Sequence, residues 1–170
     1  LWKRGESDYC EVRGSNIHGR GVYATTFIPK DTRVIEYVGE IIDKRESDRR
    51  GASQQKKADT TGDAAVYIFT LDEHWDLDGD QPDNDARLIN HSCDPNCETV
   101  TEKRRIFIEA IRTIQPGEEL SYDYQIQREP GDPPEIDEIF ACRCGSPKCR
   151  GTMLWPPEDP RKKKSAKKTA

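Results

Sequence analysis

The sequence predicts a mainly β fold. Short stretches rich in β-branched and aromatic residues recur along the 170 residues, and Thr32–Val38 and Val66–Leu71 are the clearest of them. Turn-forming residues separate such stretches roughly every 8 to 12 residues, a spacing typical of small sheets. A single charged segment, residues 42–57, has the character of a helix. Together these observations favour several short strands over a helical bundle.

The first strands surround a glycine-rich turn. Tyr9–Arg13 and Val22–Ala24 are predicted to be short strands on either side of Gly14–Gly21. Glycine lets the backbone approach a ligand closely, but an ordinary hairpin turn accounts for the same residues. The next strand, Thr32–Val38, ends at Gly39.

Residues 42–57 are charged and predict one exposed helix, interrupted near Gly51 because glycine weakens helices. The small polar residues of Ala58–Ala65 follow and are expected to be mobile. The rest of the chain is predicted to hold a strand at Val66–Leu71, an acidic loop at Asp78–Asp85, a hairpin of Thr99–Thr101 and Arg105–Ile111, a short strand at Glu118–Tyr122, and a loop or linker at Gln127–Glu138.

The charge is unevenly distributed along the chain. The formal net charge is −5, yet residues 161–170 contain lysines and one arginine and no acidic residue. The rest of the chain is therefore more acidic than the total suggests, which favours a basic partner through electrostatic steering. The basic end is predicted to be disordered. It is either a solvated terminus or a segment that contacts nucleic acid or another partner.

No apolar run approaches the roughly 18 residues that a membrane-spanning helix needs. The N-terminus lacks both the apolar core of a signal peptide and an initiating methionine. We therefore expect no membrane partner, and an excised or processed piece of an intracellular protein.

Three cysteines near the C-terminus predict a metal site. Cys142, Cys144 and Cys149 form a C-x-C-x4-C pattern that is too tight for easy disulfide geometry but suits tetrahedral thiolate ligation. A closed zinc site needs a fourth ligand, and either Cys93 or Cys97 can supply it. Such a metal would clamp the C-terminal segment onto the centre of the chain, in a reducing compartment.

Tyr122 and Tyr124 share one face of a predicted strand because side chains alternate along strands. Paired tyrosines of this kind serve packing more often than catalysis, so their role stays open at this point. The sequence has no phosphate-binding loop and no H-E-x-x-H pattern. Composition and spacing alone thus reach a mainly β, zinc-clamped domain with a tyrosine-lined site.

Five motifs, in order, resemble a known family. They are I-H-G-R-G-V-Y-A from Ile17, I-E-Y-V-G-E from Ile35, R-L-I-N-H-S-C-D-P-N-C at Arg87–Cys97, G-E-E-L-S-Y-D-Y at Gly117–Tyr124, and C-R-C-G-S-P-K-C-R-G from Cys142. Together they resemble a SET-domain protein lysine methyltransferase with a post-SET zinc module. The resemblance covers roughly Val12 to Gly151. It leaves out any cysteine-rich segment upstream, and Lys44–Ala65 follows no pattern of the family.

The resemblance implies a SET fold, in which small β-sheets surround a knot-like centre, with a short helical insert and a zinc-clamped post-SET tail. It also implies domain bounds. The SET domain would occupy residues 9–125, the post-SET module residues 138–154, and the basic, disordered tail residues 155–170.

The resemblance further implies residue roles. Tyr124 would be the catalytic tyrosine, Tyr122 would stand beside the lysine channel, and Tyr67 would line it. The implied S-adenosylmethionine contacts are His18, Gly19, Arg20, Tyr67, Asn90, His91 and Arg143. The implied ligands of one structural zinc ion are Cys93, Cys142, Cys144 and Cys149, with Cys97 and Cys10 as buried free thiols.

The implied activity is methyl transfer from S-adenosylmethionine to a lysine of a basic protein tail, first of all a histone. A non-histone substrate and a catalytically inactive binding module are the alternatives. Because Tyr122 would leave little room for a methylated amine, monomethyl and dimethyl products are expected. Accessory subunits would fit this role, and a eukaryotic protein would act in the nucleus or on chromatin.

Overall fold

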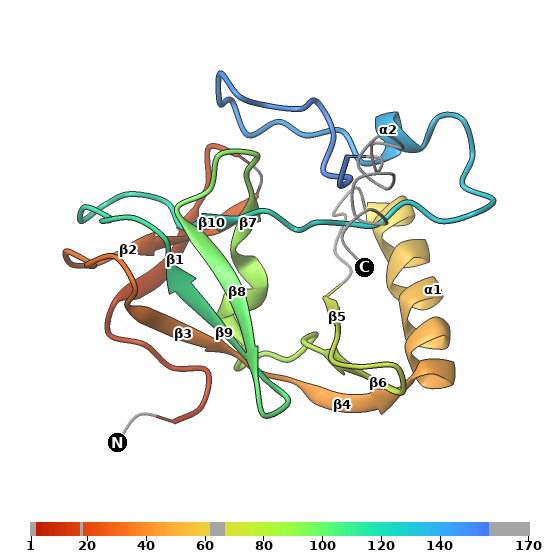
Figure 1. The fold of residues 1–170 in the computed structure, drawn as a ribbon, viewed down its shortest axis with the longest axis horizontal. Helices are drawn as coiled ribbons and strands as arrows, with labels where there is room; N and C mark the ends of the chain where they lie inside the picture. Colours follow the sequence, from red (N-terminus) through yellow and green to blue (C-terminus); the bar gives the residue numbers. More distant parts are fainter. Residues whose placement is uncertain (1–2, 18, 62–66, 157–170) are drawn as a thin grey trace, which may run out of the picture.

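The computed structural model describes residues 3–17, 19–61 and 67–156 and confirms the prediction of a mainly β fold (Figure 1). Its strands are β1 (Cys10–Gly14), β2 (Arg20–Ala24), β3 (Arg33–Tyr37), β4 (Glu40–Asp43), β5 (Ile68–Thr70), β6 (Trp75–Asp78), β7 (Asn90–His91), β8 (Cys97–Glu102), β9 (Arg105–Ala110) and β10 (Ser121–Tyr122). The helices are α1 (Lys44–Thr61), the 3₁₀-helix η1 (Asp85–Leu88) and the single turn α2 (Ile136–Ile139).

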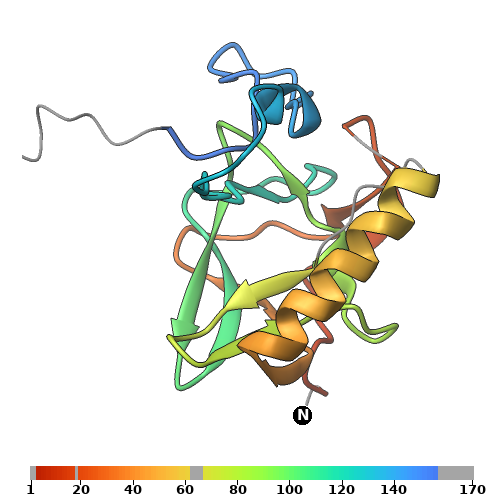
Figure 2. The ribbon, with the colours of Figure 1, turned by 90° about the vertical axis from the view of Figure 1, so that its right-hand side faces the viewer.

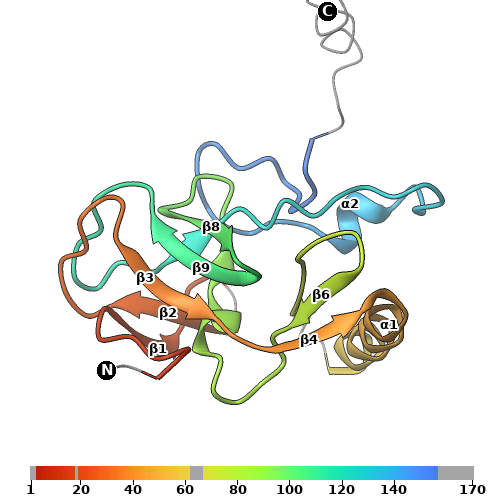
Figure 3. The same cartoon turned by 60° about the horizontal axis from the view of Figure 1, so that its bottom comes forward.

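Two three-stranded sheets lie beside each other, and β3 runs on into β4 to join them (Figure 3). The first has the strand order β3-β9-β8, and the predicted hairpin forms its β8 and β9. Lys103 and Arg104 turn the hairpin with φ values of 50° and 61°, the conformation of tight two-residue hairpin turns. The predicted strand pair at the N-terminus also forms, as antiparallel β1 and β2.

The second sheet has the order β4-β6-β5, and α1 packs along it (Figure 2). The helix differs from its prediction because it begins at Lys44 and runs without interruption through Gly51 to Thr61. Contacts with the sheet outweigh the weakness of glycine in a helix. Arg50 donates to Asp78 of β6 at 3.0 Å and Gln54 accepts from the Tyr67 N–H at 3.2 Å, so both sides of Gly51 are held.

Two strands are shorter than predicted, and one predicted loop contains the start of a helix. The strand expected at Glu118–Tyr122 reduces to β10, while Glu119 makes an isolated bridge to Tyr23. The strand expected from Val66 is observed as β5, which begins at Ile68. The loop expected at Gln127–Glu138 contains the start of α2. The two differences in the strands follow from tertiary pairing, which local residue preferences do not specify.

The core lies between the first sheet, the β1–β2 pair and the central segments. Its fully buried aliphatic side chains are Val22, Ile28, Val34, Ile89, Ile106, Ile108, Ile114 and Leu120. Their burial contributes most of the stability of a domain this size, at about 25 cal/mol per Å² of apolar surface removed from water. The core therefore forms a fixed support for the polar segments above it.

A parallel strand pair forms the centre of the fold. β7 pairs with β10 so that Asn90 lies opposite Ser121 and His91 opposite Tyr122. The buried side chain of Asn96 donates to the Glu119 carbonyl oxygen at 2.8 Å and accepts from the Ser121 N–H at 2.9 Å. Two segments that are distant in the chain are thereby locked together.

Several predictions fall on residues outside the described part of the chain. They concern His18, the end of the expected mobile stretch at residues 62–65, and residues 157–170 of the basic tail. Within the described part, no helix combines the length and the apolar character needed to cross a membrane.

Candidate functional site

The β7–β10 pair brings the predicted site aromatics together. The ring centroids of His91 and Tyr124 lie 5.2 Å apart, and those of Tyr122 and Tyr124 lie 4.9 Å apart. His91 and Tyr122 are buried. Because the strands that carry these residues pair in parallel, the N-H-S-C and Y-D-Y motifs form one site.

Tyr124 is fixed at both ends. Its backbone N–H donates to His91 Nδ1 at 3.0 Å, and its hydroxyl donates to the Ile89 carbonyl oxygen at 2.6 Å. Burial raises the pKa of Tyr124 above its ordinary value, and the neighbouring Tyr67 and Glu119 raise it further. The phenol therefore stays neutral near pH 7. Because its proton is directed to Ile89, the oxygen retains lone pairs that can accept a hydrogen bond.

His91 connects Tyr124 to the cysteines. Burial lowers the pKa of His91 to about 4, and the charge of Asp123 offsets this only in part, so the ring is neutral near pH 7. A backbone N–H can only donate, which means that His91 Nδ1 is the unprotonated nitrogen and Nε2 carries the hydrogen. Nε2 lies 3.4 Å from Cys93 Sγ. His91 thus donates towards a sulfur that could bind a metal.

Asn90 holds the glycine-rich turn against the centre. Its amide nitrogen donates to the Arg20 carbonyl oxygen at 3.0 Å, to Ser15 Oγ at 3.1 Å and to Glu119 Oε1 at 2.9 Å. The Glu119 carboxylate also accepts from Ser15 Oγ at 2.6 Å and from the Tyr23 hydroxyl at 3.2 Å. Two of the residues implied for cofactor binding, Arg20 and Asn90, are therefore in contact.

The two glycines of the turn have different surroundings. A Cβ added at Gly21 would overlap the Glu119 carboxylate, so glycine at this position is explained by internal packing. Gly19 has a φ of +46°, and a Cβ there would meet no atom of the described residues within 4 Å. Close approach of a ligand thus fits the backbone at Gly19 rather than at Gly21.

Three further residues are implied for cofactor binding, and the structure describes two of them, Tyr67 and Arg143. Tyr67 is half-buried, its carbonyl oxygen accepts from the Tyr37 hydroxyl at 2.9 Å, and Arg87 lies 5.9 Å from the centre of its ring. Arg143 is exposed between two of the clustered cysteines. His18 lies outside the described residues.

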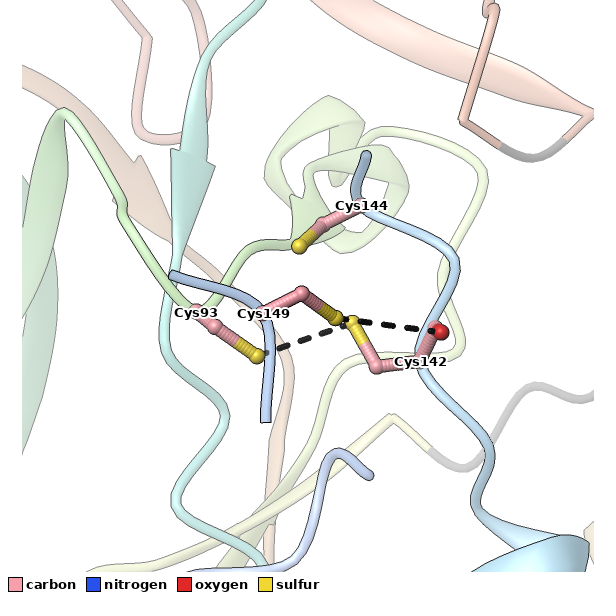
Figure 4. Close-up of side chains that lie close together, drawn as sticks. All are labelled: Cys93, Cys142, Cys144 and Cys149. Carbon is pink, nitrogen blue, oxygen red and sulfur yellow. Dashed lines mark hydrogen bonds between the residues drawn. The ribbon is translucent and has the colours of Figure 1, made fainter. Parts of the chain in front are cut away.

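Four cysteines form a compact cluster (Figure 4). Cys93 comes from the loop after β7, and the other three, Cys142, Cys144 and Cys149, come from residues 127–156, called the C-terminal segment below. The four sulfur atoms all lie within 4.8 Å of one another, and Cys93 Sγ lies 3.7 Å from Cys142 Sγ. A disulfide requires about 2.05 Å, whereas sulfurs about 2.3 Å from one tetrahedral zinc ion stand roughly 3.8 Å apart. The spacing therefore fits zinc and excludes a disulfide between Cys93 and Cys142.

The surroundings of the cluster shift its thiols in opposite directions, because burial raises the pKa values of Cys93 and Cys142 whereas backbone N–H donors favour the thiolate of Cys144. Cys93 Sγ accepts from the Arg150 backbone N–H at 3.4 Å, and Cys149 Sγ accepts from the Gly151 N–H at 3.3 Å. Burial by itself would raise the pKa of Cys144, but N–H donors of Cys93 and Ser146 outweigh it and lower this pKa to about 6. Four soft donors in tetrahedral spacing would fill every position on zinc, as in structural sites.

Cys97, the other candidate for the fourth ligand, lies in β8 and is buried in the core. Burial raises its pKa to about 12, and the pKa of half-buried Cys10 is raised to about 11 for the same reason. Both are therefore unreactive thiols near pH 7. The structure thus places Cys93, and not Cys97, beside the three C-terminal cysteines.

Comparison with known proteins agrees with this architecture. A model of the SET domain matches residues 19–125. The chain belongs to the SET domain family. The histone H3 lysine-4 specific histone-lysine N-methyltransferase of Schizosaccharomyces pombe is 44% identical over 143 residues, which are 82% of this chain and 14% of that protein. The corresponding protein of Saccharomyces cerevisiae is 40% identical over 143 residues, 82% of this chain and 12% of the yeast protein.

The histone-lysine N-methyltransferase trithorax of Drosophila virilis is 40% identical over 147 residues, 84% of this chain and 4% of that protein. This SET domain chain therefore spans only a small part of the length of these curated relatives. The family match ends at residue 125, so the cysteines of the C-terminal segment lie beyond it.

Sequence reasoning missed three residues of this SET domain site. They are Glu119, which holds Asn90, and the pair Asp123 and Arg150, whose contact joins the cluster to the tyrosines. The only local signals were their positions inside G-E-E-L, inside Y-D-Y and directly after Cys149. A charged residue within a short motif does not reveal its partner 27 residues away.

Proposed function

We propose that this SET domain is a protein-lysine N-methyltransferase that transfers a methyl group from S-adenosylmethionine to a lysine of histone H3. The observation that carries the proposal is the arrangement of Tyr124. Its hydroxyl donates to Ile89 and its N–H to His91, which leaves the neutral oxygen of this half-buried tyrosine with acceptor capacity. Such an oxygen can orient an amine or accept a polarised C–H group.

S-adenosylmethionine supplies an electrophilic methyl group on a positively charged sulfonium. In-line transfer to an amine mainly needs alignment and exclusion of water. Lysine in water has a pKa near 10.4 and is protonated at neutral pH. The buried aromatic surroundings of Tyr122 and Tyr124 disfavour the charged amine through desolvation, and Tyr67 would add to them. The tyrosines thus promote the nucleophilic form and orient it.

The residues present fit the cofactor. We assign its binding to Gly19, Arg20, Asn90 and His91, with Tyr67, His18 and Arg143 added by family resemblance. The open space at Gly19 and the contact of Asn90 with the Arg20 carbonyl support this assignment. We likewise assign a structural zinc ion to Cys93, Cys142, Cys144 and Cys149, in a post-SET module at residues 138–154 that follows a SET domain at residues 9–125.

Histone H3, at lysine 4, is the proposed substrate because the fungal relatives are named for that specificity. The acidic body of the chain complements a basic histone tail. Tyr122 is buried beside Tyr124, which supports monomethyl and dimethyl products. Action on chromatin follows from this substrate, and accessory subunits and nucleic-acid contact by the basic tail stay predictions.

Methylation of peptides tests the proposal. The purified chain is incubated with labelled S-adenosylmethionine and an array of histone H3 peptides in which each lysine is replaced by arginine in turn. Label on every peptide except those that lack lysine 4 is the expected result. Label that depends on another lysine, or appears only on non-histone proteins, would replace the substrate. Cofactor binding without any transfer would identify a binding module instead.

A further inference from the structure

Arg150 spans the distance between the cysteine cluster and the tyrosine site. Its backbone N–H donates to Cys93 Sγ at 3.4 Å, directly after the clustered Cys149. Its guanidinium donates to both carboxylate oxygens of Asp123, at 2.6 and 3.1 Å, and to the Leu154 carbonyl oxygen at 3.4 Å. One residue therefore contacts the cluster through its backbone and the site through its side chain.

Asp123 is the residue between the two site tyrosines. Its side chain is 13% exposed, and its Oδ1 lies 3.7 Å from His91 Nδ1, the nitrogen that accepts the Tyr124 N–H. His91 Nε2 returns to Cys93 Sγ at 3.4 Å. The contacts thus form a closed ring that runs from Cys93 through Arg150, Asp123 and His91 back to Cys93.

One donor of the Arg150 guanidinium has no hydrogen-bond partner among the described residues. Its Nε is the one buried side-chain nitrogen or oxygen without a hydrogen-bond partner among residues 3–17, 19–61 and 67–156. An unsatisfied buried donor costs free energy, and such exceptions call for a reason. The two hydrogen bonds to Asp123 supply that reason, because they hold the guanidinium where Nε has no acceptor and fix the carboxylate beside His91.

We propose that the Arg150–Asp123 ion pair is a positioning pair that couples the four-cysteine centre to Tyr124. The placement of Tyr124 then depends on the cysteine centre, and metal retention by that centre depends on the ion pair. Its kinetic consequence rests on the proposed methyltransferase activity, whereas its effect on metal retention does not. Neither residue is assigned contact with the reacting atoms. They act through His91 and Tyr124.

The expected effect follows from the contacts. Without Arg150, the Asp123 carboxylate faces the unprotonated Nδ1 of His91 with no cation to neutralise it, and two hydrogen-bond acceptors repel. The ring or the carboxylate must then move, which disturbs the bond that fixes the Tyr124 N–H. A displacement near 1 Å in an alignment-driven reaction lowers turnover by up to about a hundredfold.

The test compares Arg150→Gln, Asp123→Asn, the double variant and the conservative Arg150→Lys. Arg128→Gln is the matched control, because Arg128 also donates to both carboxylate oxygens of an aspartate, Asp137, at 3.2 and 2.6 Å. That pair is more exposed and lies in the same C-terminal segment. Circular dichroism and thermal melts establish whether each variant is folded. If Arg150→Gln does not fold, Arg150→Lys replaces it in the comparison.

Two readouts decide the proposal. The first compares the change in kcat on the histone peptide with the change in the Kd for S-adenosylmethionine. We expect kcat to fall about tenfold to a hundredfold in both single variants, with no further loss in the double variant and a smaller change in Kd. Arg150→Lys should recover part of the loss, and Arg128→Gln should match the wild type.

The second readout is zinc loss to a chromogenic chelator. Asp123→Asn should release zinc about tenfold faster than Arg128→Gln, although the change is not at a metal ligand. Unchanged zinc release in both single variants would overturn the coupling, as would additive kcat losses or a fall in cofactor affinity equal to that in kcat. If the wild type transfers no methyl group, the proposed function fails and zinc release alone decides the coupling.

Discussion

At the scale of single residues, the site depends on how Tyr124 is held. Its hydroxyl is committed as a donor to Ile89, and its raised pKa keeps it protonated. Tyr124 is therefore unsuited to act as a base that removes the proton from lysine. In the proposed reaction Tyr124 would be an oriented acceptor, and the lysine would lose its proton to water or before it enters the site.

Removal of the Tyr124 hydroxyl tests this role. Tyr124→Phe keeps the ring packed against His91 and Tyr122 but removes the acceptor, so kcat should fall on the order of a hundredfold or more. Cofactor affinity should stay near the wild-type value because the hydroxyl acts on the reacting groups. The melting temperature should fall only slightly, since the Ile89 carbonyl loses one hydrogen bond worth about 1 kcal/mol. An unchanged kcat would remove Tyr124 from the catalytic role.

Tyr122 is expected to limit the number of methyl groups. Tyr122→Phe removes one buried oxygen beside Tyr124, which makes room for an amine that already carries methyl groups. The product mixture should shift towards dimethyl- and trimethyl-lysine with little loss of the first transfer. Mass spectrometry of a histone H3 peptide over a time course measures the shift. Trimethyl-lysine as the main wild-type product would contradict the assignment.

At the scale of elements, α1 is attached to its sheet by polar contacts. Arg50 pairs with Glu40 of β4 at 2.8 Å and with the buried Asp78 of β6 at 3.0 Å, in addition to Glu46 within α1 at 2.7 Å. Lys44 pairs with the buried Asp76 at 2.5 Å. A helix so rich in charged residues gains little from apolar burial, so these pairs fix its position on the sheet.

Loss of Arg50 should loosen α1 selectively. Arg50→Gln leaves the Asp78 carboxylate buried with less compensation, which should cost about 2 kcal/mol of unfolding free energy. Arg49→Gln is the matched control, because Arg49 is largely exposed and pairs with Glu46 on the helix surface, where such pairs contribute less than about 1 kcal/mol. Hydrogen exchange should become faster in α1 for Arg50→Gln alone. Equal effects of both variants would refute the polar attachment.

At the scale of the whole molecule, the cysteine cluster joins the C-terminal segment to the SET domain. The C-terminal segment also contacts Ile126, the residue that follows the SET domain, through a bridge from Leu154 and a bond from the Trp155 N–H to the Ile126 carbonyl oxygen at 2.8 Å. Leu154 is the one buried residue among residues 127–156, whereas the core around Ile108 contains many buried apolar side chains. The position of the C-terminal segment should therefore depend on metal, whereas the core should not.

Metal removal tests whether the C-terminal segment depends on zinc while the core does not. Cys149→Ser, or chelation of the wild type, should reduce bound zinc from about one equivalent towards zero, because four thiolates close one tetrahedral site. Hydrogen exchange should accelerate across residues 140–154 and at the Tyr124 amide, while β8 and β9 stay protected. Full protection of the C-terminal segment in the metal-free protein would show that zinc does not hold it.

The sequence by itself determined the features that depend on neighbours in the chain. The strand-forming stretches on either side of Glu102–Arg104 predicted the β8–β9 hairpin, and the spacing of Cys142, Cys144 and Cys149 predicted one cysteine cluster. Five ordered motifs indicated the SET domain family, which the match over residues 19–125 confirms. Each of these predictions rests on short stretches of sequence, in which strand-forming residues, ligand spacing and motifs are directly visible.

Only the tertiary structure decided the interactions between distant segments. It selected Cys93 over Cys97, extended α1 through Gly51, paired Asn90–His91 with Ser121–Tyr122, and placed Arg150 on Asp123. Each of these depends on where the chain returns to itself after tens of residues. Local preference carries no information about that return, because the free energy of packing and charge pairing is set by the partner segment.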